Sequence, residues 1–418
     1  MTTTLAYHFD YSCPYAYIGS RSVEAFATEC NAALTWEPFL LGGVFRAVGT
    51  PQKLFATLSA AKSKHNMEDL HRFAARHGCP LTMPAAHPFR TVEALRATLL
   101  ARTAEGALDA RVIHGFFEAY WVRNEPISEE ATLRRVLSDA GHDADTILPR
   151  LSDAKDALIA QTDRAIALGI FGAPTYVMQA DDEAPQLFWG QDRLHLVRHA
   201  LTGEHVPLDG MEEHAKPTAP HTLEVFYDYA SPFAYLGASQ VAALAARTGC
   251  EVVWKPLLLG GLFKAIGQVD VPIEAFSEVK RAYTMRDMQR WAAHWKVPFK
   301  FPSVFPMRTV EALRFTLAMP ESIRHLFQHD VFQAAWAEDA DIASRAVLTR
   351  IAERHLDAAA LEAVLAKVGS EAVKQALRDA TEEAQARGVF GAPTFIVDGA
   401  QLYWGQDRLG LVERALSA

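Results

Sequence analysis

Apolar residues follow two kinds of pattern along this chain: short runs typical of strands, and longer stretches with the periodicity of amphipathic helices. A β-rich run at Leu5 to Phe9 is followed by an apolar-periodic stretch that opens with Pro14, as expected when proline occupies the first turn of a helix. A second strand is predicted at Leu34 to Trp36, and a long region of mainly helical pattern comes next. A strand at Thr175 to Met178, a further short strand and a C-terminal helix complete the series.

The same series occurs twice because the sequence repeats itself. The run RTVEALR begins unchanged at Arg90 and at Arg308. FWGQDRL, from Phe188, returns as YWGQDRL from Tyr403. A period of about half the chain indicates a duplicated domain, because solenoid repeats are only roughly 20–50 residues long.

The order of elements in each copy predicts the fold class. Strand, helix, strand, a large helical insert, then helix, strand, strand and helix is a thioredoxin-like layout. We therefore expect an α/β protein with two thioredoxin-like domains in tandem, each with a large all-helical insertion. The domains are predicted at residues 1–203 and 222–418, joined by a linker at 204–221 that is rich in proline, charge and histidine. The two copies could pack as an intramolecular pseudo-dimer.

Composition and charge exclude several classes of protein. Half of the residues are hydrophobic and 22% are charged, which is typical of a globular chain. The net charge is −9 and no stripe of lysine or arginine is present, so we expect no nucleic-acid partner. We expect no membrane segment, because no apolar run reaches about 18–20 residues. The N-terminus does not resemble a secretory signal, and four cysteines without a Cys-x-x-Cys pair predict neither a disulfide framework nor a metal site, so a cytoplasmic location is expected.

The turn between the first strand and the first helix carries the strongest chemical signal. It reads Ser-Cys-Pro-Tyr around Cys13 and Ala-Ser-Pro-Phe around Ser231. A thiol or hydroxyl at a helix start faces unpaired backbone N–H groups and the positive end of the helix dipole, which lowers a thiol's pKa and stabilises a thiolate of the protein or of a ligand. A helix cap would explain a serine equally well, but cysteine is a poor cap.

Two further motifs recur in both copies. Ala173-Pro174 and Ala392-Pro393 each follow glycine and precede threonine and a strand, and we predict that both X-Pro bonds are cis, with an ordinary trans proline as the alternative. The motif Trp-Gly-Gln-Asp-Arg-Leu then begins a helix. An acidic residue there could be only a cap, or it could bind an amino-acid-like ligand together with the helix N–H groups. The residues concerned are Gln191, Asp192, Gln406 and Asp407.

Taken together, these motifs resemble the 2-hydroxychromene-2-carboxylate isomerase family, which is related to kappa-class glutathione transferases and DsbA-type thioredoxin folds. The resemblance implies a glutathione-dependent enzyme in which Ser231, and Cys13 in the first copy, hydrogen-bonds the glutathione sulfur. It implies that the residue before each proline pairs with the cysteinyl backbone of glutathione and that the Gln-Asp pair holds its γ-glutamyl end. Cofactor-binding positions carried over in this way are Ala392, Pro393, Gln406, Asp407, Lys280 and Gln268, and Ala173, Pro174, Gln191, Asp192, Lys62 and Thr50 in the first copy.

The chain departs from the family pattern at the predicted substrate pocket. Thr50 and Gln268 stand where the family usually has asparagine. His87-Pro-Phe-Arg and Phe305-Pro-Met-Arg replace the family's His-Pro-Phe-Asn. Aromatic residues of the helical insert, Tyr120 among them, are expected in the core, although some could cover an aromatic substrate.

The function implied is isomerisation of a small aromatic enol- or pyruvate-type substrate by reversible addition of the glutathione thiolate. Ser231 makes the second copy the better match. The alternative is a kappa-like glutathione transferase or a DsbA-like monothiol oxidoreductase that uses Cys13, which has no nearby second cysteine to resolve a disulfide.

Overall fold

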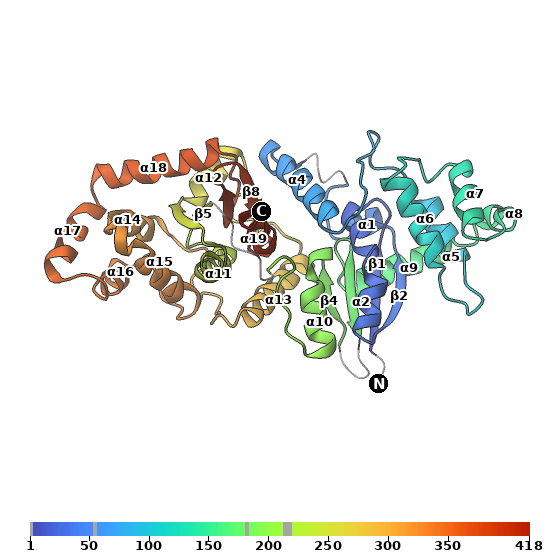
Figure 1. The fold of residues 1–418 in the computed structure, drawn as a ribbon, viewed down its shortest axis with the longest axis horizontal. Helices are drawn as coiled ribbons and strands as arrows, with labels where there is room; N and C mark the ends of the chain where they lie inside the picture. Colours follow the sequence, from blue (N-terminus) through green and yellow to red (C-terminus); the bar gives the residue numbers. More distant parts are fainter. Residues whose placement is uncertain (1–2, 53–56, 180–183, 212–219) are drawn as a thin grey trace. The chain divides into compact units, whose positions relative to one another are not determined.

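Each half of the chain contains a mixed four-stranded sheet, and the strand order is the same in both halves. The computed structural model describes residues 3–52, 57–179, 184–211 and 220–418 (Figure 1). The orders are β2-β1-β3-β4 and β6-β5-β7-β8. In the first sheet β1 runs parallel to β2 and antiparallel to β3, and β4 runs antiparallel to β3. The second sheet repeats these directions. The predicted α/β class with two thioredoxin-like domains is confirmed.

The strands are short, and the central strand pair of each sheet is mostly buried, as suits a sheet covered by helices. In the first half they are β1 (Thr4–Phe9), β2 (Ala33–Pro38), β3 (Thr175–Gln179) and β4 (Gln186–Trp189). In the second half they are β5 (Thr222–Tyr227), β6 (Glu251–Pro256), β7 (Thr394–Val397) and β8 (Gln401–Trp404).

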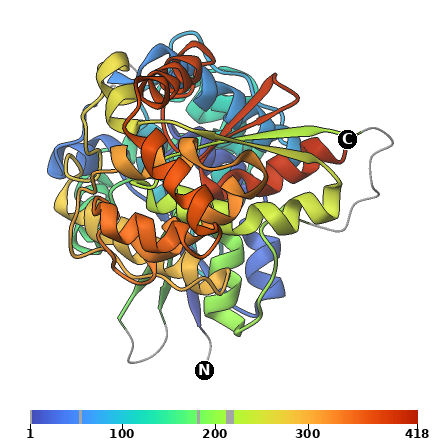
Figure 2. The same ribbon diagram turned by 90° about the vertical axis from the view of Figure 1, so that its left-hand side faces the viewer.

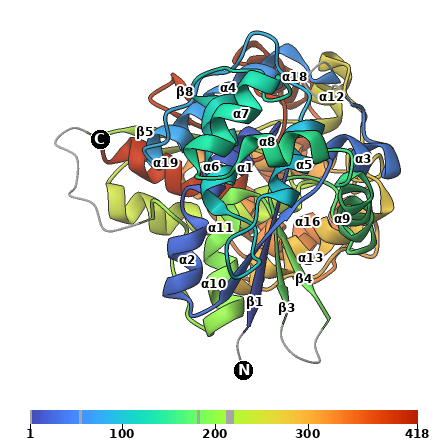
Figure 3. The ribbon, with the colours of Figure 1, turned by 90° about the vertical axis from the view of Figure 1, so that its right-hand side faces the viewer.

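The helices of the first half follow the order expected from the sequence. They are α1 (Pro14–Ser20), α2 (Val23–Glu29), α3 (Leu41–Ala47), α4 (Ala60–Arg76), α5 (Val92–Leu100), α6 (Ala110–Trp121), α7 (Glu130–Asp139), α8 (Ala144–Ile147), η2 (Leu148–Arg150), α9 (Lys155–Ala167), η3 (Gln191–Arg193) and α10 (Leu194–Thr202). The inserted helices α5 to α8 lie together as one group beside the strands (Figures 1 and 3).

The second half has a corresponding set. Its helices are α11 (Pro232–Thr248), α12 (Leu259–Ile266), α13 (Glu278–His294), α14 (Val310–Ala318), α15 (Glu321–Trp336), α16 (Arg345–Ala352), α17 (Ala358–Val368), α18 (Glu371–Ala386), η4 (Gln406–Arg408) and α19 (Leu409–Leu416). Figure 2 shows the orange helices of this insert gathered as one group. In the described part of the chain, no helix is long and apolar enough to cross a membrane.

The chain divides into two compact units that exchange short segments of sequence. The first unit contains residues 1–57, 67–206 and 277–283, and the second contains residues 58–66, 207–276 and 284–418. The start of α4 therefore belongs to the second unit, and the start of α13 belongs to the first. The predicted linker falls partly outside the described residues, because 212–219 are not among them.

Candidate functional site

The residue before the first helix differs between the halves but has the same backbone conformation. Cys13 precedes α1 and Ser231 precedes α11, both extended with φ of −97°. The Oγ of Ser231 accepts a hydrogen bond from the backbone N–H of Ala234 at 3.1 Å and so caps its helix. Cys13 makes no such bond to the start of α1.

Both side chains donate a hydrogen bond to the residue that precedes the predicted cis-proline. The Sγ of Cys13 lies 3.0 Å from the carbonyl oxygen of Ala173, and the Oγ of Ser231 lies 2.7 Å from that of Ala392. The Ala173-Pro174 and Ala392-Pro393 bonds are cis, as the sequence predicts. The first two motifs are therefore in direct contact in each half.

The third motif is hydrogen-bonded to the same prolines. The N–H of Gly190 donates to the carbonyl of Pro174, and the N–H of Gly405 donates to that of Pro393, both at 3.0 Å. Gly190 has a φ of +110°, and a Cβ there would lie 2.5 Å from the Oδ1 of Asp192, so glycine is required on two grounds. The turn before the first helix, the cis-proline and the Gln-Asp motif thus meet at one place in each half.

The polar groups of this third motif are buried. Asp192 and Arg193 are each less than one-tenth exposed and form an ion pair at 2.9 Å, and Asp407 pairs with Arg408 at 3.1 Å. Gln191 is 6% exposed, and its Nε2 has no hydrogen-bond partner within the described ranges. A buried amide donor without an acceptor is costly, so this position fits a ligand carboxylate.

The pKa of the Cys13 thiol is raised, whereas its place at a helix start predicts a lowered pKa. Burial raises the pKa of Cys13 to about 12, although the backbone N–H groups of Tyr15 and Ala16 act to lower it. The side chain is only 8% exposed. Loss of water around a thiolate therefore outweighs the helix start, and Cys13 is a protonated donor near neutral pH.

The two predicted lysines lie with the motifs of the other repeat. The Nζ of Lys62 is 4.9 Å from the centre of the Trp404 ring, and both residues belong to the second unit. The Nζ of Lys280 is 5.6 Å from the ring centre of Trp189 in the first unit. Burial lowers the pKa of Lys62. The sequence predicted that each lysine acts in its own copy. In the structure, each lysine lies beside the tryptophan of the other copy.

A residue three positions after each lysine makes a hydrogen bond to the same tryptophan. The N–H of Trp404 donates to the Nε2 of His65 at 3.1 Å, and the N–H of Trp189 donates to the hydroxyl of Tyr283 at 2.9 Å. Each tryptophan directly precedes the Gly-Gln-Asp turn. The exchanged segments therefore hold the strand that leads into the candidate site.

Thr50 and Gln268 occupy the segments that follow α3 and α12. Their backbone N–H groups bond to the carbonyls of Phe45 and Phe263, each at 2.8 Å. Among the contacts described, none joins either side chain to Cys13 or Ser231. A role for Thr50 and Gln268 in ligand binding stays a prediction.

Two buried aspartates support the site and were not singled out as functional from the sequence. Asp10 accepts hydrogen bonds from the N–H of Ser12 at 2.9 Å and of Leu41 at 2.8 Å. Asp228 bonds in the same way to the N–H groups of Ala230 and Leu259. Their position directly after the strand, within the Asp-x-x-[Ser/Cys]-Pro motif, was the available signal. They orient the turn that carries Cys13 or Ser231.

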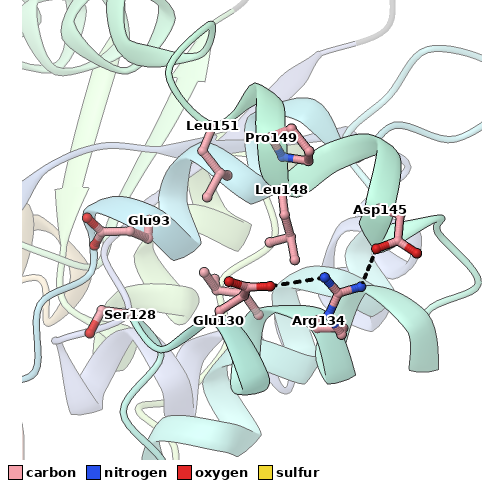
Figure 4. A pocket seen from close by; sticks show the side chains of 9 residues that line it. Glu93, Ser128, Glu130, Arg134, Asp145, Leu148, Pro149 and Leu151 are labelled. Carbon is pink, nitrogen blue, oxygen red and sulfur yellow. Dashed lines mark hydrogen bonds and ion pairs between the residues drawn. The ribbon is translucent and has the colours of Figure 1, made fainter.

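A cavity of about 360 Å³ lies elsewhere in the first unit, among α5, α7, α8 and η2 (Figure 4). Its lining includes Glu93, Glu130, Arg134 and Asp145. Arg134 bonds to both Glu130 and Asp145 across the cavity wall. Three of these charges are thus paired with one another, Glu93 pairs with Arg90, and no predicted site residue lines this cavity.

Comparison with known proteins agrees with the duplication. The family model described as a DSBA-like thioredoxin domain matches residues 4–202 and again residues 222–417. A 2-hydroxychromene-2-carboxylate isomerase of Sphingobium xenophagum is 32% identical over 196 residues, covering 47% of this chain and 97% of the relative. Glutathione S-transferase kappa 1 of Rattus norvegicus is 29% identical over 207 residues, covering 46% of this chain and 90% of the relative.

A solved structure of a selenomethionine-substituted 2-hydroxychromene-2-carboxylate isomerase is 28% identical. It covers 47% of this chain and 94% of its own, with a TM-score of 0.42. Each of these proteins therefore corresponds to about half of the present chain.

Proposed function

Because the chain belongs to the DsbA-like thioredoxin family, within the group of 2-hydroxychromene-2-carboxylate isomerases and kappa-class glutathione transferases, we propose that it is a glutathione-dependent isomerase of a small aromatic substrate. The observation that carries this proposal is the hydrogen-bonded chain from helix start to proline to Gln-Asp turn in both halves. In the second half it runs from Ser231 to Ala392, and from Pro393 to Gly405. The names of the relatives supply the substrate class.

The residues present fit glutathione, a tripeptide with two carboxylates and a thiol. In the first half the buried Nε2 of Gln191 offers a donor without an acceptor in the described structure. Asp192, and Asp407 in the second half, would face the ammonium group. The backbone of Ala173 or Ala392 would pair with the cysteinyl peptide. When bound, glutathione supplies a sulfur nucleophile that can add reversibly to a conjugated double bond.

The exchanged lysines complete each proposed site. Lys62 would act with Ser231, Gln406 and Asp407, because it lies in the second unit. Lys280 would act with Cys13 and the corresponding motif of the first unit. A half-buried ammonium beside an indole is suited to a carboxylate, since little water competes for it.

Ser231 is proposed to hold the sulfur negatively charged by donating its hydroxyl proton to it. Its Oγ is already aligned by the N–H of Ala234, which leaves the hydroxyl proton available for the carbonyl of Ala392 or for a ligand. Cys13 would donate its thiol proton in the same place, but S–H is the weaker donor. The second half is therefore proposed to be the more active one.

The alternative, a redox enzyme that uses Cys13, is disfavoured by one observation. A thiol whose pKa is raised to about 12 is almost wholly protonated at pH 7 and is a poor nucleophile. A glutathione transferase would use the same ligand-binding residues, so its distinction from an isomerase rests on the products formed.

Three variants of the full chain test the proposal: Ser231→Ala, Cys13→Ala and the double variant. With 2-hydroxychromene-2-carboxylate and glutathione, Ser231→Ala should lower kcat by roughly 10²-fold in the second half, the effect of removing one positioned donor. Cys13→Ala should cost less, and the double variant should be the least active. Unchanged turnover in all three variants would reject the assignment.

A further inference from the structure

The first half contains a hydrogen-bonded histidine–tyrosine pair that the proposed function has not used. The Nδ1 of His87 lies 2.8 Å from the hydroxyl of Tyr120. The same hydroxyl accepts a hydrogen bond from the backbone N–H of Phe89, also at 2.8 Å. Tyr120 is fully buried, whereas His87 is partly exposed.

Contacts on both sides of this pair connect it to the turn that carries Cys13. The hydroxyl of Thr91, the residue before α5, lies 3.4 Å from the Oδ2 of Asp10. The indole N–H of Trp121, next to Tyr120, donates to the carbonyl of Tyr11 at 2.8 Å. Burial raises the pKa of the Tyr120 phenol, and the nearby charge of Asp10 raises it further. The pair therefore lies beside the thiol end of the candidate site.

One tautomer of His87 lets the phenol of Tyr120 both accept and donate in this cluster. The N–H of Phe89 occupies one lone pair of the Tyr120 oxygen, and the phenol O–H can donate to Nδ1 of the imidazole when the ring proton of His87 is on Nε2. Burial lowers the pKa of His87, so the ring is neutral at pH 7. In this tautomer His87 is an uncharged donor through Nε2, and its ring is oriented by Tyr120.

The second half has neither member of the pair. Phe305 corresponds to His87, since each lies three residues before the RTVEALR run. Ala335 corresponds to Tyr120, because Trp336 donates its indole N–H to Tyr229 O at 2.8 Å just as Trp121 does to Tyr11.

Aromatic rings occupy this region of the second half instead. The rings of Phe301 and Phe305 are 4.9 Å apart, and Phe301 packs on Trp336 at 5.9 Å. The halves therefore differ here by a polar pair, because the first half has histidine and tyrosine where the second has phenylalanine and alanine.

We propose that His87, oriented by Tyr120, is a catalytic and specificity-determining hydrogen-bond donor of the first half, acting on the ketone oxygen of a 2-oxo acid substrate. This inference rests on the proposed isomerase function. As the substrate's double bond is attacked, its electron pair moves onto that oxygen, and it returns when the attacking group leaves. His87 keeps its Nε2 proton throughout and stabilises the transient negative charge, so no proton is gained or lost. The second half, with Phe305, lacks this donor and selects for the aromatic ring instead.

The binding part of the inference is tested without turnover, by NMR of the full chain labelled with ¹⁵N-histidine and kept free of glutathione. The His87 signals, assigned by their loss in His87→Phe, should show protonated Nε2 and unprotonated Nδ1. Adding 2-hydroxychromene-2-carboxylate should shift the Nε2 signal. Tyr120→Phe keeps the aromatic ring at position 120 but removes the hydroxyl, so His87 should become a mixture of its two tautomers. A single tautomer in Tyr120→Phe, or a His87 signal that the compound leaves unmoved, would overturn the inference.

The catalytic part is tested in the Ser231→Ala chain, where the remaining turnover belongs to the first half. Adding His87→Phe should lower its kcat by roughly 10²-fold, and Tyr120→Phe by less, because the donor remains but is disoriented. The control His71→Gln changes an exposed histidine of α4 and should have no effect. Equal kcat with and without His87→Phe would refute the catalytic role. Absence of glutathione-dependent conversion by the unmodified chain would instead refute the proposed function, and the NMR experiment would still decide whether His87 binds the compound.

Discussion

At the scale of single residues, the two halves place a sulfur atom and an oxygen atom in equivalent positions before the first helix. Cys13 and Ser231 share a backbone conformation, and each donates to the carbonyl before the cis-proline of its own half, so the thiol replaces the hydroxyl without moving the turn. The thiol and the hydroxyl differ in their strength as hydrogen-bond donors and in the free energy needed to ionise them. Burial makes the Cys13 thiolate unfavourable, so this cysteine acts through its proton.

The protonated state of Cys13 predicts slow reaction with oxidised glutathione. At pH 7 we expect almost no mixed disulfide on Cys13 in the folded chain. Because its pKa is about 12, the thiolate fraction and the adduct rate should rise about tenfold per pH unit between pH 7 and pH 9. Mass spectrometry of tryptic peptides measures the adduct.

The control for this experiment is the unfolded chain. In denaturant all four cysteines, which are buried in the folded structure, should react. Rapid and pH-independent modification of Cys13 in the folded chain would show an activated thiolate and would favour the redox alternative.

At the scale of elements, the helix that carries the site is continuous in one half and broken in the other. The 17-residue α11 begins at a capped Ser231, whereas the corresponding stretch of the first half is divided into α1 and α2. The hydroxyl of Tyr7 donates to the carbonyl of Ala16 within α1 at 2.6 Å, and Val225 takes the place of Tyr7 in the second half. A side chain bonded into a helix is a recognised cause of a bend.

The missing cap of α1 predicts the effect of Cys13→Ser. Serine should accept a hydrogen bond from the N–H of Ala16, as Ser231 does from Ala234, and stabilise the first unit by about 1 kcal/mol. Denaturant unfolding measures this change in free energy. The same variant should raise first-half turnover in the Ser231→Ala chain.

The matched control is Ser231→Cys, which should destabilise the second unit by a similar amount. A Cys13→Ser chain that is no more stable than the parent would contradict the assignment of the cap.

At the scale of the whole molecule, neither repeat makes a compact unit from its own sequence alone. Residues 58–66 of the first repeat belong to the second unit, and residues 277–283 of the second repeat belong to the first. Both segments bond to the tryptophan before the Gln-Asp turn. The expected intramolecular pseudo-dimer stays a prediction, but each proposed site depends on both repeats.

This exchange predicts that a change in one repeat loosens the candidate site of the other. Tyr283→Phe removes the acceptor of the Trp189 N–H, and an unpaired buried N–H costs about 1–3 kcal/mol. Hydrogen exchange at Trp189 and Gly190 should become faster, while exchange at Trp404 should not change. His65→Phe should have the reverse pattern. Mass spectrometry resolves the two segments, and changes confined to the mutated repeat would contradict the exchange.

The sequence by itself determined the duplication, the order of elements, the cis bonds at Ala173-Pro174 and Ala392-Pro393 and the residues of the three motifs, but not the cis bonds at His87-Pro88 and Phe305-Pro306. These depend on local chemistry: proline at a helix start, glycine where φ must be positive, and apolar periodicity repeated in two copies. The meeting of the three motifs was implied by the family resemblance, in which all three bind one glutathione molecule. The ligand-binding roles of these residues remain predictions.

Only the tertiary structure decided the protonation of Cys13, the partners of Lys62 and Lys280, and the pairing of His87 with Tyr120. A helix start lowers a thiol's pKa locally, but the opposing loss of hydration depends on everything packed around Cys13. Likewise, a lysine's position in its own repeat does not reveal that the segment carrying it folds with the other repeat. Burial and contacts between segments distant along the chain are properties of the packed molecule, and no short stretch of sequence contains them.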